Sequence, residues 1–170
     1  MSMNKFSLFL DLPQLKNTVD SLAIEVGNPS FMPHITLASH LSMDATSVIE
    51  GVKSIAGMTK PFDITFDGLG TENREFRFLC LLAVQSEPLK RLYGQVHQTF
   101  PVSSKETFVA WPHASILYGT QKTIEKYPTI EPFLDRFGDS LNTTTKIDAI
   151  SIWDTSGSVA QWKLVESIKL

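Results

Sequence analysis

Two short stretches decide the fold of this chain: Pro33-His34-Ile35-Thr36-Leu37 and Pro112-His113-Ala114-Ser115-Ile116. Both read Pro-His-x-(Thr/Ser)-apolar, and they lie nearly half of the 170-residue chain apart. Each opens an apolar segment that predicts a strand. A proline suits the start of a strand, because its missing N–H costs little there. The two stretches therefore predict equivalent strands in two halves of one molecule.

The segments around the two motifs repeat one order of elements. Apolar residues recur with a period of two or of about 3.6, which predicts strands and helices in turn. The predicted strands are 6–10, 34–41, 62–67, 75–84, 113–118, 146–153 and 160–168, and predicted helices begin near 13, 44, 86 and 120. The order is β-α-β-α-β twice, followed by one more strand. We therefore predict an α+β fold: one duplicated, bilobal domain over residues 1–170, with pseudo-repeat halves of about 1–72 and 73–170 whose antiparallel-rich sheets face a central cleft.

The spacing inside each motif directs its polar residues to one face. In a strand, residues i and i+2 point to the same side, about 6.6 Å apart. His34 and Thr36 therefore project together, and so do His113 and Ser115. Brought together across a cleft, two imidazoles and two hydroxyls would form a cradle for one tetrahedral phosphate.

This set of groups suits the hydrolysis of a cyclic phosphodiester. The reaction needs a base for the attacking water and an acid for the leaving alkoxide, and histidine, with an ordinary pKa near 6.5, can serve as either. Hydroxyls can donate to the non-bridging oxygens as their charge grows. No cluster of His, Asp, Glu or Cys stands at ligand spacing in the sequence, so neither a metal ion nor another cofactor is expected.

The two motifs resemble the paired H-x-(T/S) signatures of the two-histidine (2H) phosphoesterase superfamily. Their flanks, 32–41 and 112–119, are most similar to the cyclic phosphodiesterases of yeast and plants. The resemblance implies the duplicated bilobal fold. It also implies hydrolysis of ADP-ribose 1″,2″-cyclic phosphate to ADP-ribose 1″-phosphate, a by-product of tRNA splicing, and of nucleoside 2′,3′-cyclic phosphates to 2′-phosphates.

Carried over residue by residue, the resemblance implies that His34 and His113 are catalytic and that Thr36 and Ser115 bind phosphate. It favours His113 as the base and His34 as the acid, although the sequence itself does not assign these roles. Tyr118 matches a position near the substrate in the family. Alternation from His113 places Tyr118 on the opposite face, so a site role and a core role both remain open.

Two further aromatic residues are candidates for binding the substrate. Phe9 and Trp111 could stack on a nucleobase, although a core position is the ordinary role of such residues. Trp111 ends a polar loop, 101–111, that could act as a lid over the second motif. We keep both as candidate substrate-binding residues beside Tyr118.

Composition limits the class of partner. The net charge is −3 and the pI about 5.8, and no basic stripe is visible, so we expect a small cyclic-phosphate nucleotide rather than long nucleic acid. No segment is long enough to span a membrane, and the N-terminal apolar stretch is too short for a signal peptide. A cytoplasmic monomer without a membrane partner is the default expectation.

Two alternatives remain open. One keeps the site and changes the substrate, as in a 2′-5′ RNA ligase or an RNA-end-processing phosphoesterase. The other is a non-catalytic module that binds nucleotides. The absence of a basic stripe argues against the first, and the intact His and hydroxyl pairs argue against the second.

Overall fold

The chain folds into strands and helices in the predicted alternation. The computed structural model describes residues 4–71, 75–102, 112–128, 131–137 and 143–170. The strands are β1 (Phe6–Asp11), β2 (His34–Leu41), β3 (Phe62–Gly70), β4 (Leu79–Ala83), β5 (His113–Leu117), β6 (Thr144–Ile147), β7 (Ala149–Asp154) and β8 (Lys163–Lys169). The helices are α1 (Lys16–Val26), α2 (Ala45–Ala56), α3 (Glu87–Thr99), α4 (Gln121–Lys126) and α5 (Glu131–Phe137), with short 3₁₀ helices η1 (Pro13–Leu15), η2 (Glu75–Arg77) and η5 (Val159–Gln161).

The helix ends follow local chemistry. Helix α1 stops at Gly27, whose φ of 71° is a left-handed conformation that glycine adopts at no steric cost. Helix α2 begins after Asp44, whose side chain accepts a 2.9 Å hydrogen bond from the Ser47 backbone N–H. Helix α3 begins after Ser86 in the same way, with Leu89 as the donor.

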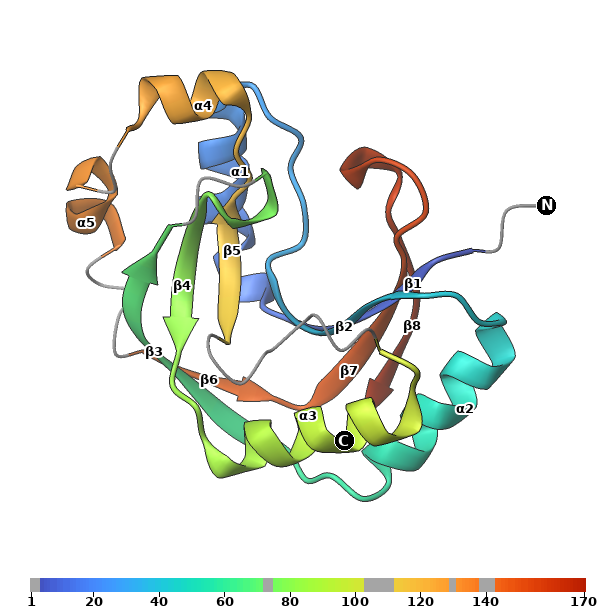
Figure 1. Ribbon diagram of the computed structural model, residues 1–170. Coiled ribbons are helices and arrows are strands. Elements are labelled where there is room, and N and C mark those ends of the chain that lie inside the picture. Colours follow the sequence, from blue (N-terminus) through green and yellow to red (C-terminus); the bar gives the residue numbers. More distant parts are fainter. Residues whose placement is uncertain (1–3, 72–74, 103–111, 129–130, 138–142) are drawn as a thin grey trace.

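The strands form one curled antiparallel sheet in the order β6-β3-β4-β5-β2-β1-β7-β8 (Figure 1). This confirms the predicted α+β class. The two four-stranded halves, β6-β3-β4-β5 and β2-β1-β7-β8, are continuous rather than separate, because β2 and β5 meet at the single pair Ile35–Ala114. The two motif strands are therefore next to each other at the centre of the sheet.

The halves of the sheet do not coincide with the halves of the sequence. Strand β3 comes from the first half of the chain but lies between β4 and β6. Strands β7 and β8 come from the end of the chain, and β7 pairs with β1. The division of the sequence into pseudo-repeats near residue 72 stays a prediction.

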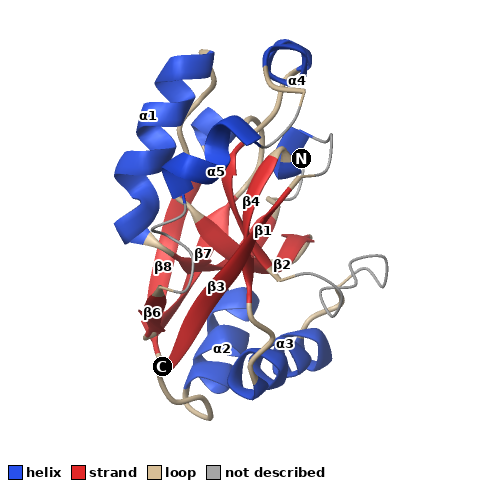
Figure 2. Ribbon diagram, turned by 90° about the vertical axis from the view of Figure 1, so that its left-hand side faces the viewer, coloured by secondary structure: helices blue, strands red, loops and turns tan. Residues whose placement is uncertain are grey.

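Helices cover one face of the sheet and leave the other for the site. Figure 2 shows α1, α4 and α5 at one end of the sheet and α2 and α3 at the other. Helix α1 contacts β5, α2 contacts β7 and β8, and α3 contacts β2 and α2. Ile35 and Leu37 of β2 join the apolar core on the covered side. Among the described residues, none of the helices combines the length and the hydropathy that crossing a bilayer needs.

Two predicted strands begin with a helical turn instead. The segment predicted as the strand 75–84 contains η2 and then β4, because the Glu75 and Phe76 carbonyls accept hydrogen bonds from Gly119 N–H and from the Ser115 hydroxyl. The segment predicted as the strand 160–168 likewise begins with η5 before β8. Turn η2 contacts β5, and the ring of Trp162, directly after η5, lies 6.4 Å from that of His34. The predicted strand 146–153 is also divided, into β6 and β7.

Candidate active site

The four motif residues meet on one face of two neighbouring strands. Ile35 of β2 pairs with Ala114 of β5, and the strands are antiparallel. In the antiparallel register set by this pair, His34 therefore lies across from Ser115, and Thr36 lies across from His113. Since Ile35 and Ala114 both face the core, the four polar residues share the opposite face.

His34 is held in one orientation by its backbone and by an aromatic ring. Its Nδ1 lies 2.6 Å from the Met32 carbonyl oxygen. A carbonyl only accepts, so Nδ1 carries the proton, and in the neutral ring the lone pair is on Nε2. The ring also stacks on Phe9, with centroids 3.6 Å apart and planes 12° from parallel. The imidazole is therefore fixed before any ligand arrives.

The environment keeps His34 neutral. The pKa of His34 is lowered to about 4, chiefly by burial and further by the charge of nearby His113, against the hydrogen bond to Met32, which raises it. Burial outweighs the hydrogen bond, because the charged ring would lose most of its hydration. At pH 7 the free protein therefore holds His34 as a neutral imidazole.

Ser115 has a structural partner in the free protein. Its hydroxyl donates a 2.6 Å hydrogen bond to the Phe76 carbonyl and lies 3.6 Å from the Cys80 sulfur. The residue is buried, and so is Cys80, its partner across β4 and β5. This bond fastens η2 to the second motif. A role for Ser115 and Thr36 in binding phosphate stays a prediction.

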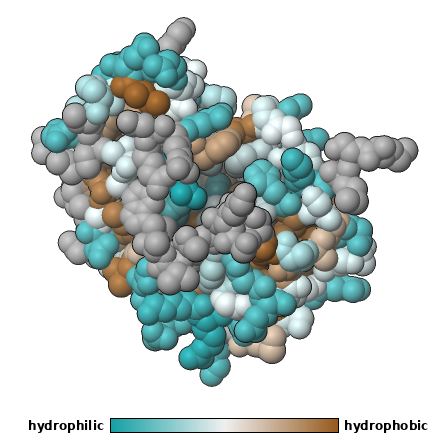
Figure 3. Space-filling model, viewed as in Figure 1, coloured by the Kyte–Doolittle hydropathy of each residue, from teal (hydrophilic) through white to brown (hydrophobic). Residues whose placement is uncertain are grey.

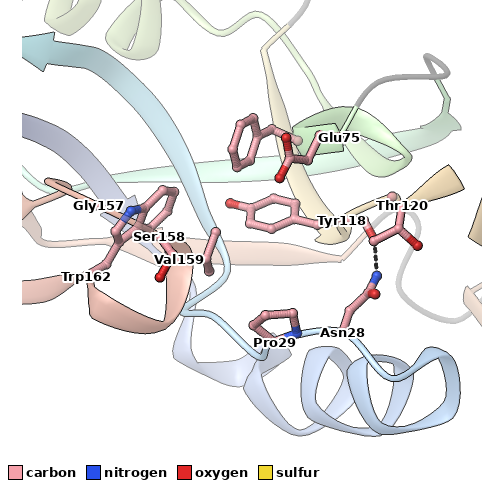
Figure 4. A pocket seen from close by; sticks show the side chains of 11 residues that line it. Asn28, Pro29, Glu75, Tyr118, Thr120, Gly157, Ser158, Val159 and Trp162 are labelled. Atoms are coloured by element: carbon pink, nitrogen blue, oxygen red, sulfur yellow. Dashed lines mark hydrogen bonds between the residues drawn. The ribbon is translucent and has the colours of Figure 1, made fainter.

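A pocket opens beside the motif residues, with a volume of about 270 Å³, near the lower end for small-molecule sites. Its aromatic wall consists of Phe76, Tyr118 and Trp162. Figure 4 shows Glu75 and Tyr118 on one side, Ser158 and Trp162 on the other, and Pro29 and Asn28 below. In the space-filling view this face of the molecule is hollowed near its centre, with apolar surface at the edge of the hollow (Figure 3).

Trp162 connects this pocket with the first motif. Its ring centroid lies 6.4 Å from that of His34 and 6.1 Å from that of Phe9. On its pocket side it lies 6.3 Å from Phe76, with the two planes 23° from parallel. The pocket and His34 thus share one aromatic wall.

The aromatic candidates from the sequence lie in different places. Strand β5 ends at Leu117, so alternation no longer applies to Tyr118, whose ring stacks on Phe31 at 3.7 Å and lines the pocket. Phe9 is 3% exposed, and its ring stacks on His34. Trp111 lies outside the described residues, as does most of the loop 101–111.

The pocket residues that sequence reasoning missed include Asn28, Glu75, Phe76 and Trp162. Phe76 and Trp162 fell within predicted strands, where alternation gave no reason to single them out. Asn28 lies just after the end of α1 and belongs to no motif, although its amide donates to the Tyr118 carbonyl at 2.6 Å. Glu75 and Phe76 are adjacent in the sequence but carry no motif, so no local signal pointed to them.

A family model described as the 2′-5′ RNA ligase superfamily matches residues 11–158. The chain belongs to this superfamily. A cyclic phosphodiesterase of Arabidopsis thaliana is 26% identical over 156 aligned positions, and the match covers 84% of this chain and 84% of that one. The predicted resemblance to the two-histidine phosphoesterases is thereby confirmed, and a phosphoesterase is the class of enzyme that the superfamily indicates.

Solved structures of the superfamily share the fold at low identity. Kluyveromyces marxianus Usb1 aligns with a TM-score of 0.58 at 15% identity, over 99% of both chains. E. coli LigT in complex with 3′-AMP aligns with a TM-score of 0.58 at 13% identity, over 100% of this chain and 99% of that one. E. coli LigT in complex with NADP+ reaches 0.62 at 16% identity, over 98% of both.

Proposed function

We propose that this protein hydrolyses cyclic phosphodiesters on nucleotides, with His34 and His113 as its catalytic residues. The observation that carries the proposal is the convergence of two His-x-(Thr/Ser) motifs on one face of two adjacent strands. Thr36 and Ser115 flank the histidines on that face. The related plant protein, named a cyclic phosphodiesterase, supports the same reaction class.

The reaction needs one imidazole on each side of the phosphorus. One takes a proton from the attacking water, and the other gives a proton to the ribose oxygen that leaves. Hydroxyl groups stabilise the charge on the non-bridging oxygens, since that charge grows as phosphorus becomes pentacoordinate. Ser115 can do so only by exchanging its bond to the Phe76 carbonyl for one to the ligand. The acid-base pair makes the reaction independent of a metal ion in this proposal.

The roles of the two histidines depend on protonation. In the free protein His34 is neutral with its lone pair at Nε2, which is the form that a base needs. The family resemblance favours the acid role for His34. That role requires the bound phosphate to raise the pKa of His34 first, because an adjacent anion favours the charged ring.

The proposed substrates are nucleoside 2′,3′-cyclic phosphates, opened to 2′-phosphates, and ADP-ribose 1″,2″-cyclic phosphate, opened to ADP-ribose 1″-phosphate. A panel of these compounds, with the position of the product phosphate determined by phosphorus NMR, tests both substrate and regiochemistry. Equal rates with and without a chelator are expected. Loss of activity with the chelator would contradict metal independence.

Replacing either catalytic histidine provides the test of the site. His34→Ala and His113→Ala should each lower kcat/KM by at least roughly 10²-fold, because each removes a proton-transfer group. His40→Asn is the matched control, since His40 is exposed at the far end of β2 and asparagine tolerates its φ of 56°. Unchanged turnover in both alanine variants, with native circular dichroism, would end the proposal.

The residual activity of His113→Ala also assigns the roles, because His34 is then the remaining histidine of the pair. If His34 is the base, kcat/KM rises as pH rises through the pKa of His34, about 4 in the intact free protein. If His34 is the acid, kcat/KM falls over the same range.

RNA-end processing is the second candidate function. It is favoured by the fold shared with K. marxianus Usb1, one structure of which holds uridine monophosphate. Against it stand the net charge of −3 and the small pocket. Faster turnover of an oligonucleotide than of every cyclic mononucleotide would favour this function. Nucleotide binding without turnover of either would favour a binding module.

A further inference from the structure

The aromatic pocket beside His34 has the carboxylate of Glu75 in its lining, and hydrogen bonds hold the backbone of this residue in place. The Glu75 carbonyl accepts a 2.7 Å hydrogen bond from Gly119 N–H, and the next carbonyl, of Phe76, accepts the Ser115 hydroxyl. The backbone of Glu75 and Phe76 is therefore held at the wall of the pocket by Ser115 in β5 and by Gly119 just after it. Figure 4 shows the Glu75 carboxylate extending over the side of Tyr118, toward the interior of the pocket.

This carboxylate has an unusual place in a pocket next to a phosphate site. Among the ion pairs that the described residues form, none includes Glu75. A carboxylate only accepts hydrogen bonds, and it repels phosphate. A nucleotide can therefore occupy the pocket favourably if it turns N–H or O–H donors toward Glu75 and keeps its phosphate at the histidines.

In a nucleoside 2′,3′-cyclic phosphate the 2′ and 3′ oxygens are esterified, so the remaining donors are the 5′-hydroxyl and the base. The 5′-hydroxyl is the same in all four nucleosides, so only the base can make Glu75 selective. Guanine presents two parallel donors, N1–H and the exocyclic amine, which match the two oxygens of one carboxylate. Adenine and cytosine present a single amine on that edge, and the one N–H of uracil lies between two carbonyls that repel a carboxylate.

The neighbouring rings can hold such a base in place. Phe76 and Trp162 are nearly parallel with centroids 6.3 Å apart, and Phe76 is 46% exposed. A base stacked between two parallel rings, at van der Waals distance from each, requires those rings to be about 7 Å apart. A small outward movement of the exposed Phe76 ring therefore admits a planar base beside Glu75. Stacking tolerates any base, so the hydrogen bonds determine which base is preferred.

We propose that Glu75 makes this site selective for guanine, so that guanosine 2′,3′-cyclic phosphate is the preferred nucleoside substrate. The inference rests on the proposed function for the location of the phosphate. The selectivity itself comes from the matched pair of acceptors on Glu75 and donors on the base.

The test measures kcat/KM for the four nucleoside 2′,3′-cyclic phosphates and for the inosine compound, whose base keeps N1–H but lacks the exocyclic amine. The guanosine compound should exceed the other three standard nucleosides by about 10- to 100-fold, the range of one good bidentate contact, with inosine between. Glu75→Gln should remove this advantage, so that all four nucleoside 2′,3′-cyclic phosphates react within about threefold of one another. Glu50→Gln is the matched control, because Glu50 lies exposed on α2, outside the pocket, and the change in charge is the same.

Two results would overturn the inference: equal rates for all bases in the unaltered protein, or a Glu75→Gln variant that slows every substrate equally. Binding of guanosine 2′-monophosphate and adenosine 2′-monophosphate, measured by calorimetry, separates this inference from the catalytic proposal. If no cyclic phosphate is opened, yet guanosine 2′-monophosphate binds at least about 10-fold more tightly and loses that advantage in Glu75→Gln, the catalytic proposal fails and the selectivity stands. If cyclic phosphates are opened without any preference for a base, the reverse holds.

Discussion

At the scale of single residues, burial of His34 has a cost that depends on pH. Its pKa is about 4 in the folded chain and 6.5 when exposed. Between pH 4 and pH 6.5 the unfolded chain therefore binds a proton at this residue that the folded chain does not bind. The contribution of this group to stability is therefore fully present above pH 6.5 and lost as pH falls to 4. The shift corresponds to about 3 kcal/mol of unfolding free energy.

We therefore expect His34→Gln to weaken the acid sensitivity of the fold. Urea unfolding at pH 7 and at pH 4 should show a loss of stability that is about 3 kcal/mol smaller in the variant than in the unaltered protein. Comparing the variant with the unaltered protein removes the contribution of the carboxylates to the pH dependence, because they titrate in both chains. His40→Asn should leave the difference unchanged. Identical pH dependence in all three chains would mean that His34 is solvated.

At the scale of elements, two glycines in the packed helices α2 and α3 predict opposite effects. A Cβ on Gly94 in α3 would meet nothing within 4 Å, so Gly94→Ala should stabilise the protein by about 0.5–1 kcal/mol. A Cβ on Gly51 in α2 would lie 2.7 Å from the Phe100 ring, so Gly51→Ala should destabilise it by roughly 1–3 kcal/mol. Urea midpoints with a common slope provide the measurement, and two shifts of the same sign would contradict this packing.

The elements also show how far the sequence can be interpreted alone. The strand 34–41 and the caps at Gly27, Asp44 and Ser86 were predictable, because periodicity and capping act within a few residues. The turns η2 and η5 were not, because long-range contacts such as Ser115 to Phe76 stabilise the first, and a strand-like pattern hides both. The motif histidines were identified from the sequence, whereas the pocket beside them is formed by residues that are distant in the sequence and is visible only in the structure.

At the scale of the whole molecule, the two halves of the sheet meet at one residue pair, and a phosphate bound there would touch both. Inorganic phosphate at about 100 times its dissociation constant should therefore raise the unfolding free energy by about 2.7 kcal/mol. Calorimetry should show a rise in Tm of about 5–10 °C. The double variant His34→Ala/His113→Ala should lose that rise, with sodium chloride at equal ionic strength as the reference. An equal rise in the variant would point to a general salt effect.

The pairing of β1 with β7 has a consequence for the newborn polypeptide. Phe6, at the start of β1, pairs with Asp154, close to the other end of the chain. During synthesis, β1 can pair with β2 on one side, but its other edge has unpaired N–H and C=O groups until β7 has been made. A chain truncated before residue 154 would leave that edge unpaired, and we expect such a product to aggregate or to be degraded.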